Sequence, residues 1–286
     1  MQNSEKKEHP STYVVQDRQN QQELTRLTIQ DQVITASMGG VLPEQPDPGA
    51  FKRVLDVGCG SGNWIIEAAK TYPTMWLAGI DVSLTMIQYA RAQAEEQQLS
   101  ERVEFRVMDA LRMLEFPAGY FDLVNIRFGV SFLRTWDWPR MLGEMLRVTR
   151  PGGTVRVTDE EIVHENNSPA LTRYFNEMLL CGLFKAGHLF EQESKSLTNH
   201  LPPLMKQHVS RQVQTKAYPL EFRAGTPAGQ AYYEDVEHMF HIMRPFVQKW
   251  GCISDEYSSI CKQALSEMQQ SDFHSTWNLL TVWGVK

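Results

Sequence analysis

One stretch in the first quarter of the chain, from Arg53 to Trp64, most constrains how this sequence can fold. It consists of an apolar run of strand length, a turn that carries Gly58, Gly60 and Gly62, and the start of an amphipathic helix. The glycines leave three positions without side chains where the backbone turns, so a ligand can lie against bare backbone there. The unpaired N–H groups of the first helical turn point toward the same place. The stretch therefore predicts a strand-turn-helix cradle for a nucleotide.

The residues around these glycines discriminate between kinds of nucleotide cradle. A phosphate-binding loop requires Gly-Lys-Ser/Thr at its end, whereas Gly62 is followed by Asn63 and Trp64. A dinucleotide fingerprint requires a glycine at the sixth position counted from Gly58, and Asn63 occupies that position. A carboxylate, Asp56, stands at the end of the strand, and the turn itself carries no cation. The pattern favours a ligand with a positive charge, such as an amino group or a sulfonium, over pyrophosphate.

Five segments in the same order resemble the motifs of class I S-adenosylmethionine-dependent methyltransferases. A single glycine motif is weak support for a family, whereas ordered motifs over about 110 residues are specific. The resemblance implies an α/β fold, namely a Rossmann-like seven-stranded, mostly parallel sheet with an antiparallel last strand. The segments are 54–62, 78–83, 103–110, 121–126 and 147–155.

The resemblance also implies S-adenosyl-L-methionine as cofactor, with S-adenosyl-L-homocysteine as the product formed from it. Asp81 matches the residue that accepts hydrogen bonds from the ribose hydroxyls, and Asp109 matches the adenine-contacting position. Tyr13, ahead of an N-terminal helix, is a candidate for the methionine carboxylate. Structural roles remain open, because Asp56 and Asp81 can also cap helices and Tyr13 can simply pack. The expected cofactor-binding residues are Tyr13, Asp56, Gly58, Gly60, Asp81, Val82, Met86, Asp109, Ala110, Asn125 and Arg127.

The segments on either side of the motifs predict additions to the core. Ser168 followed by Pro169 is typical of a helix start, whereas Pro245 is expected to interrupt a later helix. Residues 213–222 and 277–283 are expected to form the last two strands. The predicted organisation is a tail and cap helix (1–48, with the helix over 21–38), a cofactor-binding core (49–159), an inserted helical lid (160–209) and the end of the sheet (210–286), which holds a second helical insertion at about 229–272.

The acceptor of the methyl group is less well defined by the sequence. The aromatic segment 127–139 follows the fourth strand, where open α/β sheets place their ligand crevice, although Trp136 and Trp138 fit packing against the next helix equally well. The helical additions carry Met and aromatic stripes that suit a core or a lid over an apolar substrate. We predict in-line transfer to a small aromatic or apolar metabolite, as in secondary metabolism. His188 and His241 are weak candidates for a general base, because no spacing singles them out.

A metal site is not predicted, although oxygen ligands gather after the fifth strand. Carboxylates and amides suit magnesium or calcium. The run lacks the spaced acidic pattern of metal-dependent methyltransferases, however, and a solvated loop explains it better. Its members are Asp159, Glu160, Glu161, Asn166 and Asn167.

Composition and net charge limit the kinds of molecule that this protein is expected to bind and the compartment in which it is expected to lie. The net charge of −6, from 28 Lys and Arg against 34 Asp and Glu, disfavours binding to nucleic acid. Four widely spread cysteines and a polar start favour a reducing cytoplasm, and no apolar run reaches the ~20 residues of a membrane span. We expect a monomer or a homodimer. A protein or RNA methyltransferase, a non-methylating relative that binds the cofactor, and a partner-binding protein without catalysis remain alternatives; the acidic balance argues against RNA but not against protein.

Overall fold

The described part of the chain is built around one open sheet of eight strands, in a computed structural model that describes residues 13–14, 21–209 and 212–286. The strand order is β3-β2-β1-β4-β5-β8-β6, and β7 pairs with β8. Strands β1 to β5 run parallel, whereas β8 runs antiparallel to β5, β6 and β7. The strands are β1 (Arg53–Val57), β2 (Trp76–Asp81), β3 (Val103–Val107), β4 (Phe121–Arg127), β5 (Thr149–Glu160), β6 (Glu165–Asn166), β7 (Val213–Arg223) and β8 (His274–Val285). The expected Rossmann-like α/β sheet with an antiparallel last strand is confirmed, and β6 adds a strand of two residues to the seven expected.

Both faces of the sheet are covered, and successive residues of β1 show why. Val54 packs with α2 (Asn63–Thr71) and α3 (Leu84–Glu96), whereas Leu55 packs on the opposite face with α4 (Trp138–Val148). An apolar run without polar alternation suits a parallel strand buried on both faces. Strand β1 lies between β2 and β4, where the strand order reverses. In open α/β sheets a ligand binds beyond the carboxyl ends of the strands at such a point.

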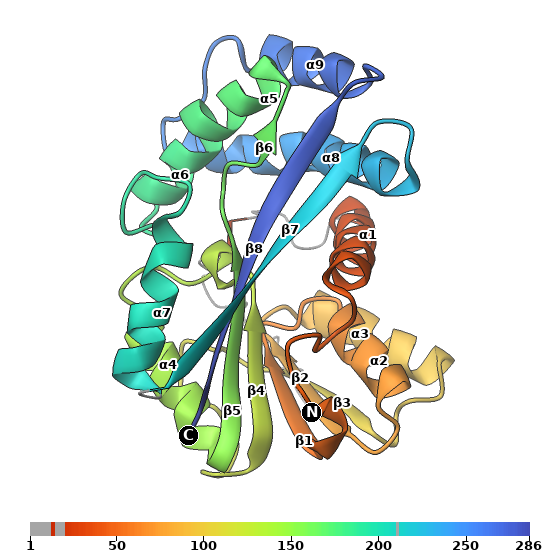
Figure 1. Ribbon diagram of the computed structural model, residues 1–286, viewed down its shortest axis with the longest axis vertical. Coiled ribbons are helices and arrows are strands. Elements are labelled where there is room, and N and C mark those ends of the chain that lie inside the picture. Colours follow the sequence, from red (N-terminus) through yellow and green to blue (C-terminus); the bar gives the residue numbers. More distant parts are fainter. Residues whose placement is uncertain (1–12, 15–20, 210–211) are drawn as a thin grey trace, which may run out of the picture.

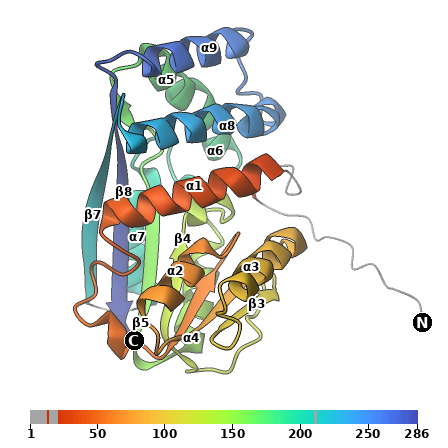
Figure 2. The same cartoon turned by 90° about the vertical axis from the view of Figure 1, so that its right-hand side faces the viewer.

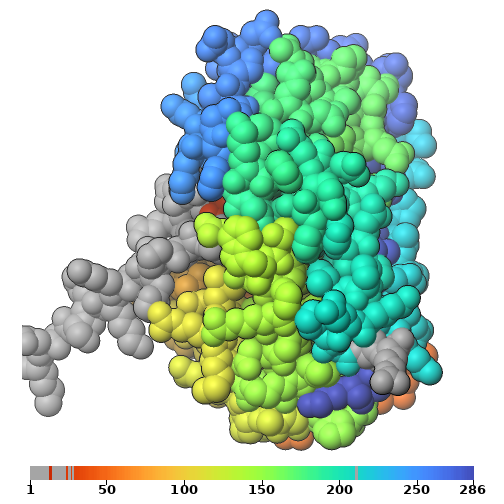
Figure 3. Space-filling model, turned by 90° about the vertical axis from the view of Figure 1, so that its left-hand side faces the viewer, coloured from red at the N-terminus to blue at the C-terminus, as the bar shows by residue number. Residues whose placement is uncertain are grey.

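A second group of helices gathers beyond this end of the core (Figures 1 and 2). The long strands β7 and β8 reach from the core into the group, and α1 lies between α8 and the core. The group comprises α1 (Gln21–Met38), α5 (Pro169–Tyr174), a π turn (Phe175–Leu179), α6 (Leu180–Lys185), α8 (Pro227–Lys249) and α9 (Tyr257–Met268). Helix α7 (Ser196–His208) descends beside α4, and Figure 3 shows the face that the chain from α5 to α7 covers. Two short 3-10 turns, Pro48–Ala50 and Gly129–Ser131, complete the elements of the described residues.

Two proline-containing segments show how local signals and packing compete. Ser168 caps α5 as expected, because its side chain accepts a hydrogen bond from the Leu171 N–H at 3.0 Å and Pro169 occupies the first turn. The interruption expected at Pro245 is wrong, since α8 continues to Lys249. Phe246 and Val247, directly after the proline, are 2% and 0% exposed. Their burial offsets the backbone hydrogen bond that Pro245 cannot donate.

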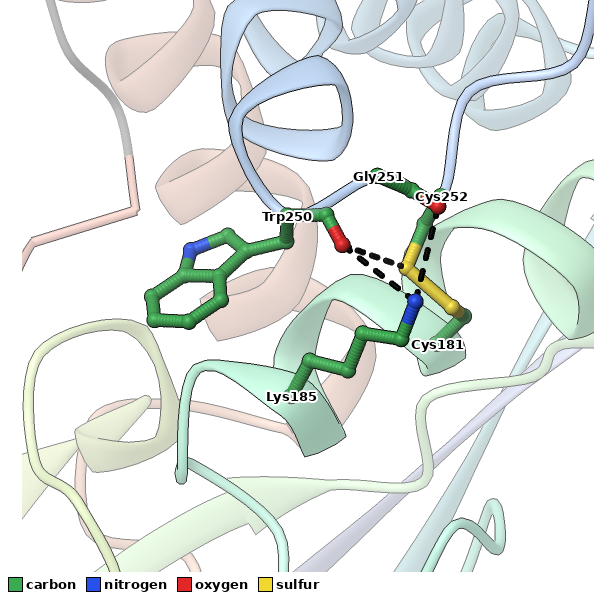
Figure 4. Close-up of a disulfide and its surroundings, with 5 residues drawn as sticks. All are labelled: Cys181, Lys185, Trp250, Gly251 and Cys252. Atoms are coloured by element: carbon green, nitrogen blue, oxygen red, sulfur yellow. Dashed lines mark hydrogen bonds between the residues drawn. A yellow bond between two sulfur atoms is a disulfide. The ribbon is translucent and has the colours of Figure 1, made fainter.

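The expectation about the cysteines is also corrected. Cys181 in α6 and Cys252 after α8 form a disulfide across 71 residues of sequence, with Cα atoms 5.9 Å apart. Figure 4 shows this link and the Lys185 ammonium, which donates to the carbonyl oxygens of Trp250 and Gly251. The fold brings together cysteines that look unrelated in the sequence, so the cysteine pattern no longer favours a reducing compartment. No helix among the described residues is long and apolar enough to cross a membrane.

Candidate active site

A cavity of about 280 Å³ lies beyond the carboxyl ends of the core strands. Its walls come from the glycine turn, the ends of β1, β2, β4 and β5, helix α1 and the helices of the second group. Every expected cofactor-binding residue except Asn125 lines it: Tyr13, Asp56, Gly58, Gly60, Asp81, Val82, Met86, Asp109, Ala110 and Arg127. The structure thus brings these residues around one space, which extends from the glycine turn to the apolar side chains of α6 and α8.

The glycine turn requires glycine for two different reasons. Gly58, Gly60 and Gly62 have φ angles of +70°, +51° and +76°, a region that residues with side chains rarely adopt. A Cβ atom on Gly62 would lie 2.6 Å from the ring of Phe105, because α2 packs tightly on the sheet. A Cβ atom on Gly60 would meet no atom within 4 Å, and Gly60 lines the cavity. The open space at Gly60 is thus the part of the turn that a bound group can fill.

The carboxylate of Asp81 is held at the end of β2 by two backbone groups. Oδ2 accepts from the Gly60 N–H at 3.1 Å, and Oδ1 accepts from the Ser83 N–H at 2.8 Å. Helix α3 is capped by Ser83, whose side chain accepts from the Met86 N–H at 3.4 Å. Asp81 therefore does not cap the helix, and its carboxylate ties the glycine turn to the wall of the cavity.

Behind the cavity, a buried chain of polar groups positions Asp56. The Asn125 amide donates to Asp56 Oδ1 at 2.7 Å, and Arg156 donates to Asn125 Oδ1 at 2.7 Å. The guanidinium of Arg156 is paired in turn with Glu44 at 2.7 Å. Burial raises the pKa of Asp56 to about 6, against the opposing effects of Arg127 and the Asn125 hydrogen bond. Asn125, which we expected to contact the cofactor, lies behind Asp56, and its role is to position that carboxyl.

An ion pair connects the end of β4 to α1. The guanidinium of Arg127, at the end of β4, pairs with the carboxylate of Asp31 on α1, and both residues line the cavity. The same guanidinium lies over the ring of Trp64, 5.8 Å from its centroid. Helix α1 is therefore attached to the cofactor end of the cavity by charge as well as by packing.

The aromatic segment after β4 divides into two parts. Phe128, Val130, Ser131 and Phe132 line the cavity, as the sequence predicts for a wall of the reaction chamber. Trp138 does not line it but is fully buried against Gly129, where a Cβ atom would lie 2.6 Å from the indole. Trp136 is 62% exposed. Of the two roles considered for these tryptophans, packing applies to Trp138.

Neither candidate histidine fits a catalytic role in this geometry. His188 is 2% exposed, its Nδ1 lies 2.9 Å from the Leu133 carbonyl oxygen, and burial lowers its pKa to about 4. His241 is exposed, and neither histidine is among the residues that line the cavity. His164 lines the cavity instead, and its ring packs against those of Trp277 and Phe175 at centroid distances of 4.8 and 4.6 Å. Its position just after the carboxyl end of β5 was the available sequence signal.

The solvated-loop expectation is wrong for the start of the acidic run, whereas Asn167 at its end is exposed. Asp159 is fully buried within β5, where it accepts from the Val130 N–H at 3.1 Å, and burial raises its pKa well above the usual range. Glu160, the last residue of β5, lines the cavity. Within the described ranges, no three His, Cys, Asp or Glu side chains gather as metal ligands.

Comparison with known proteins identifies the family of the core. A family model described as a methyltransferase domain matches residues 54–153. Ajmaline N-methyltransferase of Rauvolfia serpentina is 34% identical over 128 residues, which are 45% of this chain and 42% of that protein. Demethylmenaquinone methyltransferase of Thermus thermophilus is 38% identical over 110 residues, which are 38% of this chain and 48% of that protein. The match thus spans less than half the length of both curated relatives.

Solved structures share the fold over most of the chain. Phosphoethanolamine N-methyltransferase 2 of Haemonchus contortus, in complex with S-adenosylhomocysteine, superposes with a TM-score of 0.57 at 19% identity, covering 96% of this chain and 60% of that one. A geranyl diphosphate methyltransferase in complex with S-adenosylmethionine gives 0.53 at 15% identity, covering 94% and 93%. Identities this low show the fold alone. Residues 54–153 therefore carry a methyltransferase domain, and most of the chain shares the fold of these solved methyltransferase structures.

Proposed function

We propose that this protein transfers a methyl group from S-adenosyl-L-methionine to a small aromatic or apolar acceptor by direct in-line displacement. The observation that carries the proposal is the continuity of the cavity, in which the glycine turn and Asp81 share one space with Met239, Ile242 and Met243 of α8. A cofactor and an acceptor bound in one space can meet without diffusion through water. Holding two reactants in line contributes up to about 7–11 kcal/mol to lowering a barrier.

The residues at the glycine end fit the cofactor. The open space at Gly60 accommodates a group close to the backbone, and Asp81 presents a carboxylate suited to paired hydroxyls. Met86 and Ala110 line an apolar surface for a flat base. Asp56 supplies the negative charge expected opposite an ammonium. When bound, the cofactor supplies a methyl group on a positively charged sulfur, so the protein does not have to activate a leaving group.

The chain's own contribution is orientation and exclusion of water. Helix α1 is attached by the Asp31–Arg127 pair, and Tyr13 and Val14 line the same cavity. The Val14 N–H donates to the Ser131 carbonyl at 2.9 Å, which ties this residue to the wall after β4. These contacts enclose the reacting groups and strengthen electrostatic interactions inside the cavity.

The helices that line the cavity favour a small acceptor over a macromolecule. A protein or RNA substrate needs an open groove, whereas side chains of α1, α6 and α8 line this cavity. Relatives named for ajmaline and demethylmenaquinone, both small molecules, also support this. A role in secondary metabolism and a monomeric or homodimeric state are further predictions.

The test is transfer of label from methyl-labelled S-adenosylmethionine to a panel of small aromatic acceptors, to bulk RNA and to bulk protein. We expect label only in small molecules, detected by chromatography and mass spectrometry. Label in RNA or protein would overturn the proposed acceptor class. Cofactor binding without transfer to any acceptor would favour the non-methylating alternative.

A further inference from the structure

A cluster of polar side chains lies at the end of the cavity opposite the glycine turn. Its members come from three parts of the chain. Glu160 and His164 lie at and just after the end of β5, and both line the cavity. Tyr232 of α8 and Ser275 of β8 stand behind them, both buried. The rings of Trp277 and Phe175 pack against His164, with centroid distances of 4.8 and 4.6 Å, and restrict its orientation.

Hydrogen bonds set the direction in which His164 presents its proton. Ser275 Oγ donates to Tyr232 Oη at 3.2 Å, so the phenolic proton is available for His164 Nδ1, 2.7 Å away. Because Nδ1 then accepts, the proton of the neutral ring lies on Nε2. His164 Nε2 faces the Glu160 carboxylate across 3.9 Å, which is too long for a direct hydrogen bond.

The Glu160 carboxylate therefore has acceptor capacity toward the cavity. In the described part of the chain, no donor forms a hydrogen bond with its side-chain oxygens, and 20% of its side chain is exposed. Among the described cavity-lining residues, Arg127 is the one lysine or arginine, and it is paired with Asp31 at the cofactor end. A second carboxylate, Asp235 of α8, also lines the cavity and accepts from Gln30 at 3.2 Å. This end is thus acidic and aromatic.

We propose that this chamber recognises an amine on an aromatic or apolar scaffold, with Glu160 binding the N–H groups and the rings of Trp277 and Phe175 flanking the site. The inference rests on the methyltransferase function proposed above and specifies its acceptor. An ammonium is attracted both by a carboxylate and by aromatic faces. A phosphate or carboxylate acceptor would meet the Glu160 charge without a described cation to offset it.

The chemistry balances with Glu160 as proton acceptor. The bound ammonium gives one proton to the Glu160 carboxylate, which leaves a lone pair on nitrogen. The nitrogen then forms a bond to the methyl carbon as the C–S bond breaks, with its electron pair staying on sulfur. The methylated nitrogen carries the positive charge, and Glu160 returns its proton to solvent through its exposed part. His164 and Tyr232 act as positioning residues, because they orient the site without taking the proton.

Four compounds with a common phenyl scaffold test the proposal by binding alone. Phenethylamine, 2-phenylethanol, 4-ethylphenol and 3-phenylpropionate are titrated calorimetrically into the full chain saturated with S-adenosylhomocysteine, which has no methyl group to transfer. We expect phenethylamine to bind at least about tenfold more tightly than the other three. Glu160→Gln should abolish this preference, and Tyr232→Phe should reduce it, both without changing the affinity for S-adenosylhomocysteine.

Glu161→Gln is the matched control, because it makes the same chemical change one residue away. Glu161 does not line the cavity and pairs with Lys195 at 3.5 Å, so the amine preference should persist. A preference for the phenol or the alcohol, no preference, no binding of any compound, or an unchanged preference in Glu160→Gln would each overturn the assignment. Failure of the wild-type chain to bind S-adenosylhomocysteine would instead contradict the proposed function.

Discussion

The two ends of the cavity are built in different ways. The glycine end is local, since Asp56, Gly58, Gly60 and Asp81 lie within two strands and the turns that follow them. The opposite end is assembled from distant segments, as the sequence separation of 68 between His164 and Tyr232 illustrates. The glycine end is also defined by backbone geometry, whereas the other end depends on side chains from helices outside the parallel part of the sheet. The residues proposed to bind the cofactor can thus stay the same while those proposed to bind the acceptor change.

Removal of the disulfide is expected to have the largest effect on stability, and it tests whether the two ends of the cavity are independent. Cys252→Ser removes a link across 71 residues, and the chain-entropy model predicts a loss of about 4 kcal/mol in the free energy of unfolding. The link joins α6 to the end of α8, which together carry Leu183, Ile242 and Met243 of the cavity wall. Urea unfolding of the oxidised proteins measures the loss.

Cys261→Ser, which alters a buried free thiol, is the control and should cost distinctly less. S-Adenosylhomocysteine affinity should stay unchanged in Cys252→Ser. A matching loss of cofactor affinity would show that the two ends are not independent.

The pH dependence of stability probes the glycine end. The pKa of Asp56 is raised from 3.8 to about 6 in the folded chain, so the folded state binds its proton more tightly than the unfolded state. The stability associated with this group is fully present below about pH 3.8 and is lost as the pH rises through about 6. For a shift of about two pKa units this amounts to about 3 kcal/mol in the absence of ligand.

Asp56→Asn removes this titration. Relative to the variant, the wild-type chain should lose stability between pH 4 and pH 7, as measured by urea unfolding at several pH values. A difference between the two proteins that is constant across this range would contradict the assignment.

Substitutions of two glycines in the same turn are expected to affect different properties, the stability of the fold at Gly62 and cofactor binding at Gly60. Gly62→Ala places a Cβ atom 2.6 Å from Phe105 at a φ of +76°, and should cost about 3 kcal/mol through overpacking and strain. Gly60→Ala meets no atom within 4 Å, so backbone strain of ~1 kcal/mol is its main cost. Because its methyl group enters the cradle, Gly60→Ala should nevertheless weaken cofactor binding. Equal stability losses for the two variants, by chemical denaturation, would refute this division of roles.

The same contrast explains what sequence could predict. The glycine turn, Asp81 and the order of the strands follow from contiguous patterns, so the cradle was predictable. The Asn125–Arg156–Glu44 chain behind Asp56 was not, because alternate residues of buried strands carry no signal of which polar groups meet. The continuation of α8 through Pro245 depends on tertiary burial that outweighs a local signal. Likewise, the sequence around His164 contains no pattern that predicts its contacts with Tyr232 and Trp277.

The central claim is that the glycine end binds an adenosyl sulfur ligand, and calorimetric titration of the full chain with S-adenosylhomocysteine tests it most directly. NAD serves as the competing nucleotide, Asp81→Asn as the site variant and Glu104→Gln on β3 as the control carboxylate. We predict micromolar binding of S-adenosylhomocysteine, none of NAD, and a loss of roughly 1–3 kcal/mol in Asp81→Asn with no change in Glu104→Gln. Binding of NAD instead, or an affinity for S-adenosylhomocysteine that does not depend on Asp81, would contradict the account.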